Sequence, residues 1–214
     1  MSCLVAVALV ATALLGCEAF EVMPEPTAPS AATTPAAPAR FEPARLESPN
    51  ADIRRETALL LTKAPLPDRE QRIVVGKRLA VMAQGDPEAL VRSAALQALL
   101  VQRPISAVDV ARRVRTDVSP MVRWDAAKIL SDLGGAPRVP ALIEMLSGDP
   151  DENVRREAAK GLSRYDEPRV IRALITALDD ESDSVSHVAR ESLVKLSSGL
   201  DLGAKREAWE KWWK

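Results

Sequence analysis

Arginine and aspartate recur together at a fixed spacing along this chain. An Asp stands six positions ahead of an Arg in three places: Asp86 and Arg92, Asp117 and Arg123, and Asp149 and Arg155. A guanidinium group offers five N–H donors in a planar fork that fits a carboxylate or a phosphate. These arginines could therefore bind an acidic partner, or they could be consumed by hydrogen bonds inside the protein.

Residues suited to catalysis or metal binding are few. His187 is the single histidine, and a metal site would need further His or Cys ligands, while catalysis would need a matched nucleophile. The acidic run that includes Asp180 lies in one turn, whereas general acid–base catalysis needs carboxylates that face each other across a cleft. We therefore expect no catalytic residue, no metal and no cofactor.

The amino terminus is typical of an exported protein. Residues 4–15 form an apolar run that is too short for a bilayer span and suits a signal-peptide core. The following stretch LLGC, which ends at Cys17, resembles the lipobox of bacterial lipoproteins. That resemblance implies a signal peptide over residues 1–16 and a lipid on Cys17, the first residue of the mature chain. An uncleaved anchor and a simple secretory signal are the alternatives, and both would still export the remainder.

A Pro- and Ala-rich segment follows the cysteine. Residues 17–47 contain little apolar bulk to bury, so we expect a disordered tether. As a flexible coil it would span about 30 Å. The predicted location is therefore the bacterial cell membrane or outer membrane, with the folded part facing the periplasm or the exterior.

Composition favours an all-α fold. The chain is 47% hydrophobic but only 3% aromatic, so its core must consist of Ala, Val and Leu, which include strong helix formers. The formal net charge is -1, whereas proteins that bind nucleic acid usually carry a basic excess. The composition therefore argues against a nucleic-acid partner.

A repeat of about thirty-one residues fills residues 48–203. Its copies align on five apolar residues, here called the repeat anchors: Ile53, Val91, Val122, Val154 and Val185. Four residues later stand Thr57, Ala95, Ala126, Ala158 and Ala189, and eight later stand Leu61, Leu99, Leu130, Leu162 and Leu193. This spacing predicts an amphipathic helix in every copy, with a small residue at its closest approach to a neighbour. Ser48-Pro49, Asp86-Pro87, Ser119-Pro120 and Asp149-Pro150 are the predicted helix starts.

The pattern of two helices joined by an Asp-rich turn resembles the HEAT family, and in particular the HEAT-like repeats of bilin lyases. The resemblance implies a right-handed α-solenoid of four and a half to five helical hairpins. It also implies that Asp86, Arg92, Asp117, Arg123, Asp149 and Arg155 form a ladder of hydrogen bonds between adjacent repeats. The end copies depart from the rule, because Ser48 accompanies Arg54 and Ser186 accompanies Asp180.

A second row of residues is the predicted partner site. In a HEAT-like stack the second helices line the concave side, and equivalent positions form rows. Two residues after the anchors the row contains Arg55, Trp124, Arg156 and His187, here called the partner row. Trp and Arg dominate binding energetics at interfaces, so these residues are candidates for protein binding. The alternative is that Trp124 folds over its neighbours and Arg156 pairs with Glu152.

The last residues are rich in tryptophan. Trp209, Trp212 and Trp213 stand at helical spacings of three and four within residues 204–214. We expect this helix to cap the exposed end of the stack, as solenoids require. A membrane-interface helix is the alternative.

The function predicted from the sequence is a non-catalytic, membrane-tethered scaffold that binds a protein partner. An accessory role in covalent tetrapyrrole attachment, as in bilin lyases, is one alternative. A protein that binds nucleic acid or a lipid surface is another, which the near-neutral net charge disfavours.

Overall fold

The computed structural model describes residues 41–104, 106–133, 135 and 138–214. The predicted signal peptide, Cys17 and most of the predicted tether lie outside these residues. The chain is divided into Met1–Ala39, which lies outside the described residues, and a second unit, Arg40–Lys214, which is compact. All residues of the hydrophobic core belong to the second unit, from Leu46 to Trp209, so we expect this unit to fold on its own.

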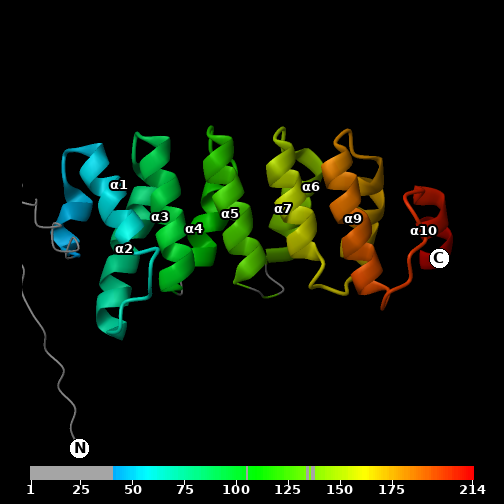
Figure 1. Ribbon diagram of the computed structural model, residues 1–214, viewed down its shortest axis with the longest axis horizontal. Coiled ribbons are helices and arrows are strands. Elements are labelled where there is room, and N and C mark those ends of the chain that lie inside the picture. Colours follow the sequence, from blue (N-terminus) through cyan, green and yellow to red (C-terminus); the bar gives the residue numbers. More distant parts are fainter. Residues whose placement is uncertain (1–40, 105, 134, 136–137) are drawn as a thin grey trace, which may run out of the picture. The chain divides into compact units, whose positions relative to one another are not determined.

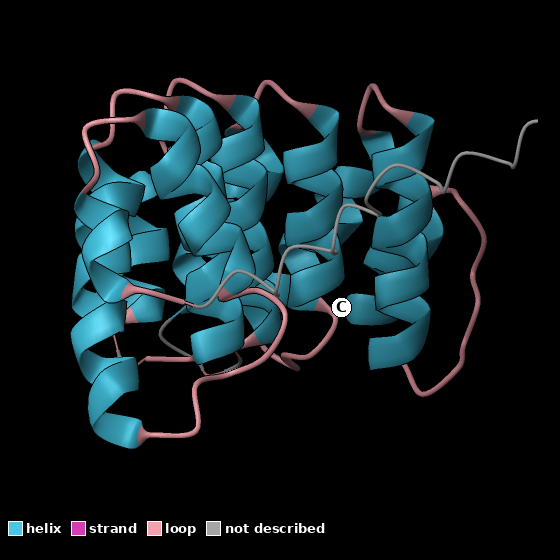
Figure 2. Cartoon of the chain, turned by 60° about the vertical axis from the view of Figure 1, so that its left-hand side comes forward, coloured by secondary structure: helices cyan, strands magenta, loops and turns pink. Residues whose placement is uncertain are grey.

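The described part of the chain is helical and contains no strand (Figures 1 and 2). Its elements are η1 (Pro43–Glu47), α1 (Ala51–Leu60), α2 (Arg69–Gly85), α3 (Ala89–Gln102), α4 (Ala107–Val114), α5 (Pro120–Asp132), α6 (Val139–Gly148), α7 (Glu152–Leu162), α8 (Pro168–Thr176), η3 (Ala177–Asp179), α9 (Asp183–Leu196) and α10 (Arg206–Trp213). We call α1, α3, α5, α7 and α9 the first helices, and α2, α4, α6 and α8 the second helices.

The helices stack as an α-solenoid. Neighbouring first helices pack against each other, and α3, α5, α7 and α9 stand side by side in Figure 1. Each second helix packs mainly against the first helix of the following hairpin, as α2 does against α3 and α6 against α7. The prediction of an all-α stack of helical hairpins is confirmed.

Small residues let the first helices approach closely. The residues four after the anchors, from Thr57 to Ala189, are at most 1% exposed, and the leucines eight after are at most 2% exposed. At Gly161 of α7 an added Cβ would lie 2.9 Å from the Cβ of Ser131, at the end of α5. Small side chains at the contacts between neighbouring first helices therefore allow the close packing of the core.

The predicted helix starts were wrong in three of four copies. Helices α1, α3 and α7 begin at Ala51, Ala89 and Glu152, two residues after the predicted Pro, and only α5 begins at the predicted Pro120. The true N-cap lies three residues before each anchor. Asp86 and Asp149 cannot serve as caps, because they stand two residues further upstream.

The predicted tether extends too far towards the folded unit. Pro43–Glu47, inside the predicted range 17–47, form η1, and Leu46 is only 1% exposed. Arg78 of α2 also pairs with Glu47, at 3.1 Å between Nε and Oε1. Within the described residues, no helix combines the length and the hydrophobicity that a membrane crossing requires.

Candidate functional site

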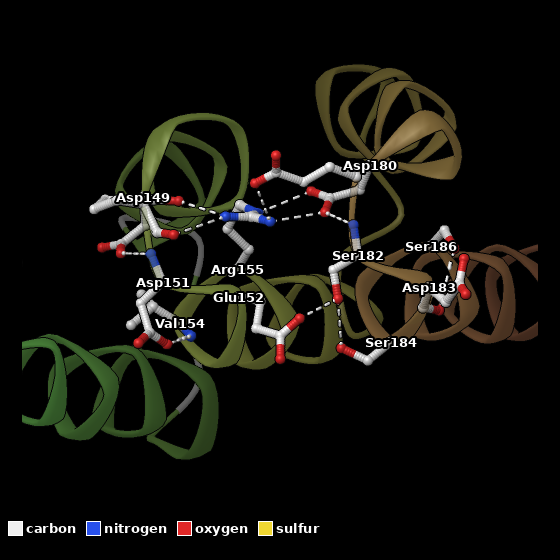
Figure 3. A network of polar contacts seen from close by, with 12 residues as sticks. Asp149, Asp151, Glu152, Val154, Arg155, Asp180, Ser182, Asp183, Ser184 and Ser186 are labelled. Atoms are coloured by element: carbon white, nitrogen blue, oxygen red, sulfur yellow. Dashed lines mark hydrogen bonds and ion pairs between the residues drawn. The ribbon is translucent and has the colours of Figure 1, made fainter.

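The arginine one position after an anchor is held from both sides. Nε and Nη2 of Arg155 donate to the two carboxylate oxygens of Asp180, each at 2.9 Å, and Nη1 donates to the backbone carbonyl of Asp149 at 2.9 Å (Figure 3). Asp149 belongs to the same repeat as Arg155, and Asp180 belongs to the next. The same two-pronged pairing, with N–O distances of 2.7 to 3.0 Å, joins Arg54 to Asp86, Arg92 to Asp117 and Arg123 to Asp149. These four pairs are here called the arginine ladder.

Each ladder aspartate also orders the turn before the next first helix. Oδ1 of Asp117 accepts a hydrogen bond from the backbone N–H of Ser119 at 2.9 Å, and Asp86, Asp149 and Asp180 make the equivalent bond. Burial by itself would raise the pKa of Asp117, but the hydrogen bonds from Arg92 and Ser119 bring that pKa below its ordinary value. The same balance lowers the pKa of Asp180. Asp117 and Asp180 are therefore held in their charged form inside the protein.

The ends of the ladder explain the two irregular copies. Ser48 occupies the aspartate position of the first copy, where no preceding repeat among the described residues supplies an arginine. Ser186 occupies the arginine position of the last copy, where no later repeat in the described residues supplies an aspartate to pair with. Asp180 accepts from Arg155 although the sequence places it in an acidic run that reads as a solvated loop. Aligning Asp180 with Asp149 of the preceding copy would have identified Asp180 as a ladder aspartate.

The partner row lies on a different face from the one expected. Its members belong to the first helices α1, α5, α7 and α9. The prediction that the row lies on the side lined by the second helices is therefore wrong, because position two after the anchor is on the first helix of its hairpin. The row instead belongs to the outer side of the first helices, which we call the first-helix face.

Two members of the row make ordinary surface contacts. Nη2 of Arg55 lies 3.5 Å from Oδ1 of Asp52, and Nε2 of His187 lies 3.3 Å from Oε1 of Glu191, each within one helix. Exposed pairs of this kind contribute little to stability.

Trp124 and Arg156 line one hollow between α5 and α7. Its volume is about 420 Å³, and Pro120, Met121, Asp151 and Asn153 complete the lining. Trp124 is half-buried and packs against the core. Arg156 forms no ion pair or side-chain hydrogen bond with the described residues, and Glu152, its expected partner, accepts a hydrogen bond from Ser182 (Figure 3). The hollow therefore combines an indole ring with an unused guanidinium group.

Sequence reasoning missed two exposed apolar residues, one of which lines this hollow. Met121 is 37% exposed and Leu90 is 52% exposed, at equivalent positions of the neighbouring helices α5 and α3. The position just before the anchor is apolar in these two copies and polar in the other three, and this break in the repeat was the available signal. Leu90, Met121, Trp124 and Arg156 are here called the central patch.

The three C-terminal tryptophans differ in exposure. Trp209 is fully buried and its Nε1 donates to the backbone carbonyl of Gly203 at 2.8 Å, Trp213 is partly buried, and Trp212 is 38% exposed. Trp212 stands edge-on to Trp209, with 5.8 Å between ring centres. Helix α10 packs against α8 as α8 packs against α6, so it occupies the place of a last second helix.

Among the described residues, no cluster of three or more His, Cys, Asp or Glu side chains is arranged to hold a metal ion. Cys17, the predicted lipidation site, lies outside these residues.

Comparison with known proteins supports the fold. A family model described as HEAT repeats matches residues 135–194. No curated protein matches the chain by sequence. The X-ray structure of the Escherichia coli protein YibA is similar, with 24% identity and a TM-score of 0.59 over 72% of this chain. This chain covers 59% of YibA, less than two thirds of its length.

Two further structures are also similar. A crystal structure of an engineered protein shares 18% identity, with a TM-score of 0.53 over 73% of this chain and 78% of that one. A designed armadillo repeat protein, solved in complex with the peptide (KR)4, shares 16% identity, with a TM-score of 0.54 over 80% of this chain and 98% of that one. At these identities the likeness shows a helical-repeat solenoid and leaves the ligand of this chain open.

Proposed function

We propose that this chain, whose fold is similar to those of HEAT and armadillo repeat proteins, is a non-catalytic scaffold that binds a protein partner through the central patch. The observation that carries this proposal is the contrast between two adjacent arginines. Arg155 is consumed by the arginine ladder, whereas Arg156 faces a hollow of about 420 Å³ beside Trp124 and pairs with no described residue.

The composition of the central patch fits a protein partner. Aromatic residues, Met and Arg are enriched in the cores of protein interfaces, and half-buried anchors that border a hollow are typical hot spots. Met121 adds exposed apolar area to the lining of that hollow, and Leu90 is exposed at the equivalent position of the neighbouring helix α3. The patch would therefore accept an apolar side chain, with an acidic group placed against Arg156.

The proposed location is the bacterial envelope, with the chain exported and anchored by a lipid on Cys17. The support is the apolar run of residues 4–15, the LLGC stretch and the Pro-rich segment that separates Cys17 from the folded unit. Replacing Cys17 by Ser should leave the chain unlipidated. Mass spectrometry of the membrane fraction should then show loss of an acyl-modified N-terminal peptide, and an unmodified peptide in the wild type would contradict the anchor.

The partner is tested by affinity capture from native membranes, comparing two double variants. Met121→Ser with Arg156→Gln removes one apolar group and one charge from the central patch. Leu59→Ser with Arg55→Gln makes the same changes on α1, where Leu59 is 39% exposed. We expect a protein captured by the wild type and by the α1 variant to be lost from the patch variant. Equal capture by both variants would contradict the proposed site.

A further inference from the structure

The net charge of the chain is near neutral, but charged residues are unevenly distributed between the first and the second helices. The second helices contain eight Lys and Arg residues against three acids, which gives them a net charge of +5. The first helices, once the four arginines of the ladder are set aside, contain six Lys and Arg residues against eight acids. The outer side of the second helices, on which Lys77, Arg112, Arg113, Arg169 and Arg172 are exposed, is here called the second-helix face.

Helix α2 exposes apolar side chains on this face. Ile73 is 46% exposed, Val74 is 51% exposed and Val81 is 71% exposed, and Lys77 is exposed between them. The opposite side of the same helix buries Val75, Leu79, Met82 and Ala83 in the core. A helix that is apolar on both sides normally has partners on both sides. No described residue covers the outer one.

Arginines continue the second-helix face along the stack. Arg112 and Arg113 of α4 line a groove of about 400 Å³ towards α6, which Asp109 and Glu144 also line, and Arg169 and Arg172 of α8 line one of about 460 Å³, which Asp179 and Asp180 also line. Arg112 pairs with Asp109 at 3.8 Å and Arg169 with Glu167 at 2.7 Å, whereas Arg172 forms no ion pair with the described residues. Nη1 of Arg113 lies 3.3 Å from Oε1 of Gln84, which joins α4 to the end of α2. The exposed cations are thus spread over several helices and do not converge on one enclosed pocket.

We propose that the second-helix face binds the surface of a membrane rich in anionic phospholipid. Ile73, Val74 and Val81 enter the headgroup region, while Lys77 and the arginines of α4 and α8 contact lipid phosphates. Exposed apolar residues flanked by Lys and Arg are the combination that holds a helix at an anionic bilayer surface. The first-helix face, with the central patch, then points away from the membrane.

A bilayer fits this face better than an acidic protein does. The three apolar residues stand out from α2, and none of them lines the grooves that hold the arginines. Helix α2 also packs against η1, the element from which the chain leads back to Cys17. This last step rests on the proposed lipid anchor, which would keep α2 near the membrane.

The test uses residues 40–214, which form one compact unit and lack both Cys17 and the apolar leader. The protein is sedimented with vesicles made of equal parts of phosphatidylglycerol and phosphatidylcholine, or of phosphatidylcholine alone. We expect binding to the anionic vesicles only, weakening as salt is added. The triple variant Lys77→Gln, Arg112→Gln, Arg113→Gln should weaken it about tenfold or more. Val74→Ser with Val81→Ser should also weaken it.

A matched control separates this face from a general charge effect. Arg55→Gln, Arg156→Gln and Lys160→Gln remove the same net charge from the first-helix face and should leave vesicle binding unchanged. All variants should keep the wild-type melting temperature, because the altered side chains lie at the surface. Failure to bind anionic vesicles, or equal loss in the control, would overturn the proposal. Binding to polyglutamate but not to vesicles would also overturn it, in favour of an acidic protein. None of these results depends on capture of the protein partner or on the lipid at Cys17.

Discussion

The hydroxyl of Ser93 on α3 donates a hydrogen bond of 2.5 Å to the carboxylate of Asp125 on the neighbouring helix α5. Both residues are only 3% exposed. Burial raises the pKa of Asp125 to about 6, although the hydrogen bond from Ser93 opposes the shift. This contact therefore joins two repeats through Asp125, whose carboxylate is charged at neutral pH although burial disfavours the charged form.

The raised pKa of Asp125 predicts a pH dependence of stability. The folded protein holds a proton on Asp125 up to a pH of about 6, while the unfolded chain releases it near 3.8. Stability should therefore fall by up to about 3 kcal/mol as pH rises through this window. Asp125→Asn should lack this decline, as urea unfolding at a series of pH values would show. An unchanged decline in the variant would contradict the assignment.

Two of the ladder aspartates, Asp117 and Asp180, should act in the opposite direction. The pKa values of Asp117 and Asp180 are lowered in the fold, so their stabilising effect is present above the ordinary pKa of 3.8 and is lost as the pH falls further. The two effects occupy different pH ranges, and the Asp125→Asn variant separates them.

The close approach of α5 and α7 predicts the effect of one methyl group. In Gly161→Ala the new Cβ would lie 2.9 Å from the side chain of Ser131 and 3.2 Å from its Cα, so the helices must move apart. We expect a loss of about 1–3 kcal/mol in the free energy of unfolding. Gly148→Ala is the control, because no atom lies within 4 Å of its new Cβ, and it should not destabilise. A neutral Gly161→Ala would show that this contact is loose.

The C-terminal helix should stabilise the stack through one side chain. Trp209 is fully buried, so Trp209→Ala should cost about 3–5 kcal/mol in the free energy of unfolding. Trp212→Ala should cost about 1 kcal/mol or less, because 38% of this residue is exposed. Thermal melting of the two variants tests this. Equal and small effects would show that α10 is not part of the core.

Features that recur in every copy were predictable from the sequence. The buried alanines and leucines and the four ladder arginines occur at constant distances from the anchors, and a stack of similar hairpins repeats the same environment at each position. The helix starts were harder, because Pro stands four residues before some anchors, as Pro87 does, but two before another, as Pro120 does. The family resemblance predicted a ladder between adjacent repeats, and the structure adds that each aspartate pairs with the arginine of the preceding repeat.

Features that occur once could not be read from the repeat. The hollow beside Trp124 depends on the side chains of α5 and α7 together, and the exposure of Met121 and Leu90 depends on what their neighbours leave uncovered. The net charge of -1 does not reveal the basic residues of the second-helix face, because much of the acidic charge lies outside the second helices.

The adjacent arginines Arg155 and Arg156 test the central claim most directly, namely that ladder guanidinium groups serve the fold while Arg156 serves a partner. Urea unfolding should show that Arg155→Gln lowers the free energy of unfolding by about 3 kcal/mol, because it leaves the carboxylate of Asp180 without its guanidinium partner. Arg156→Gln should change it by no more than about 0.5 kcal/mol. Equal losses in the two variants, or a neutral Arg155→Gln, would contradict the account.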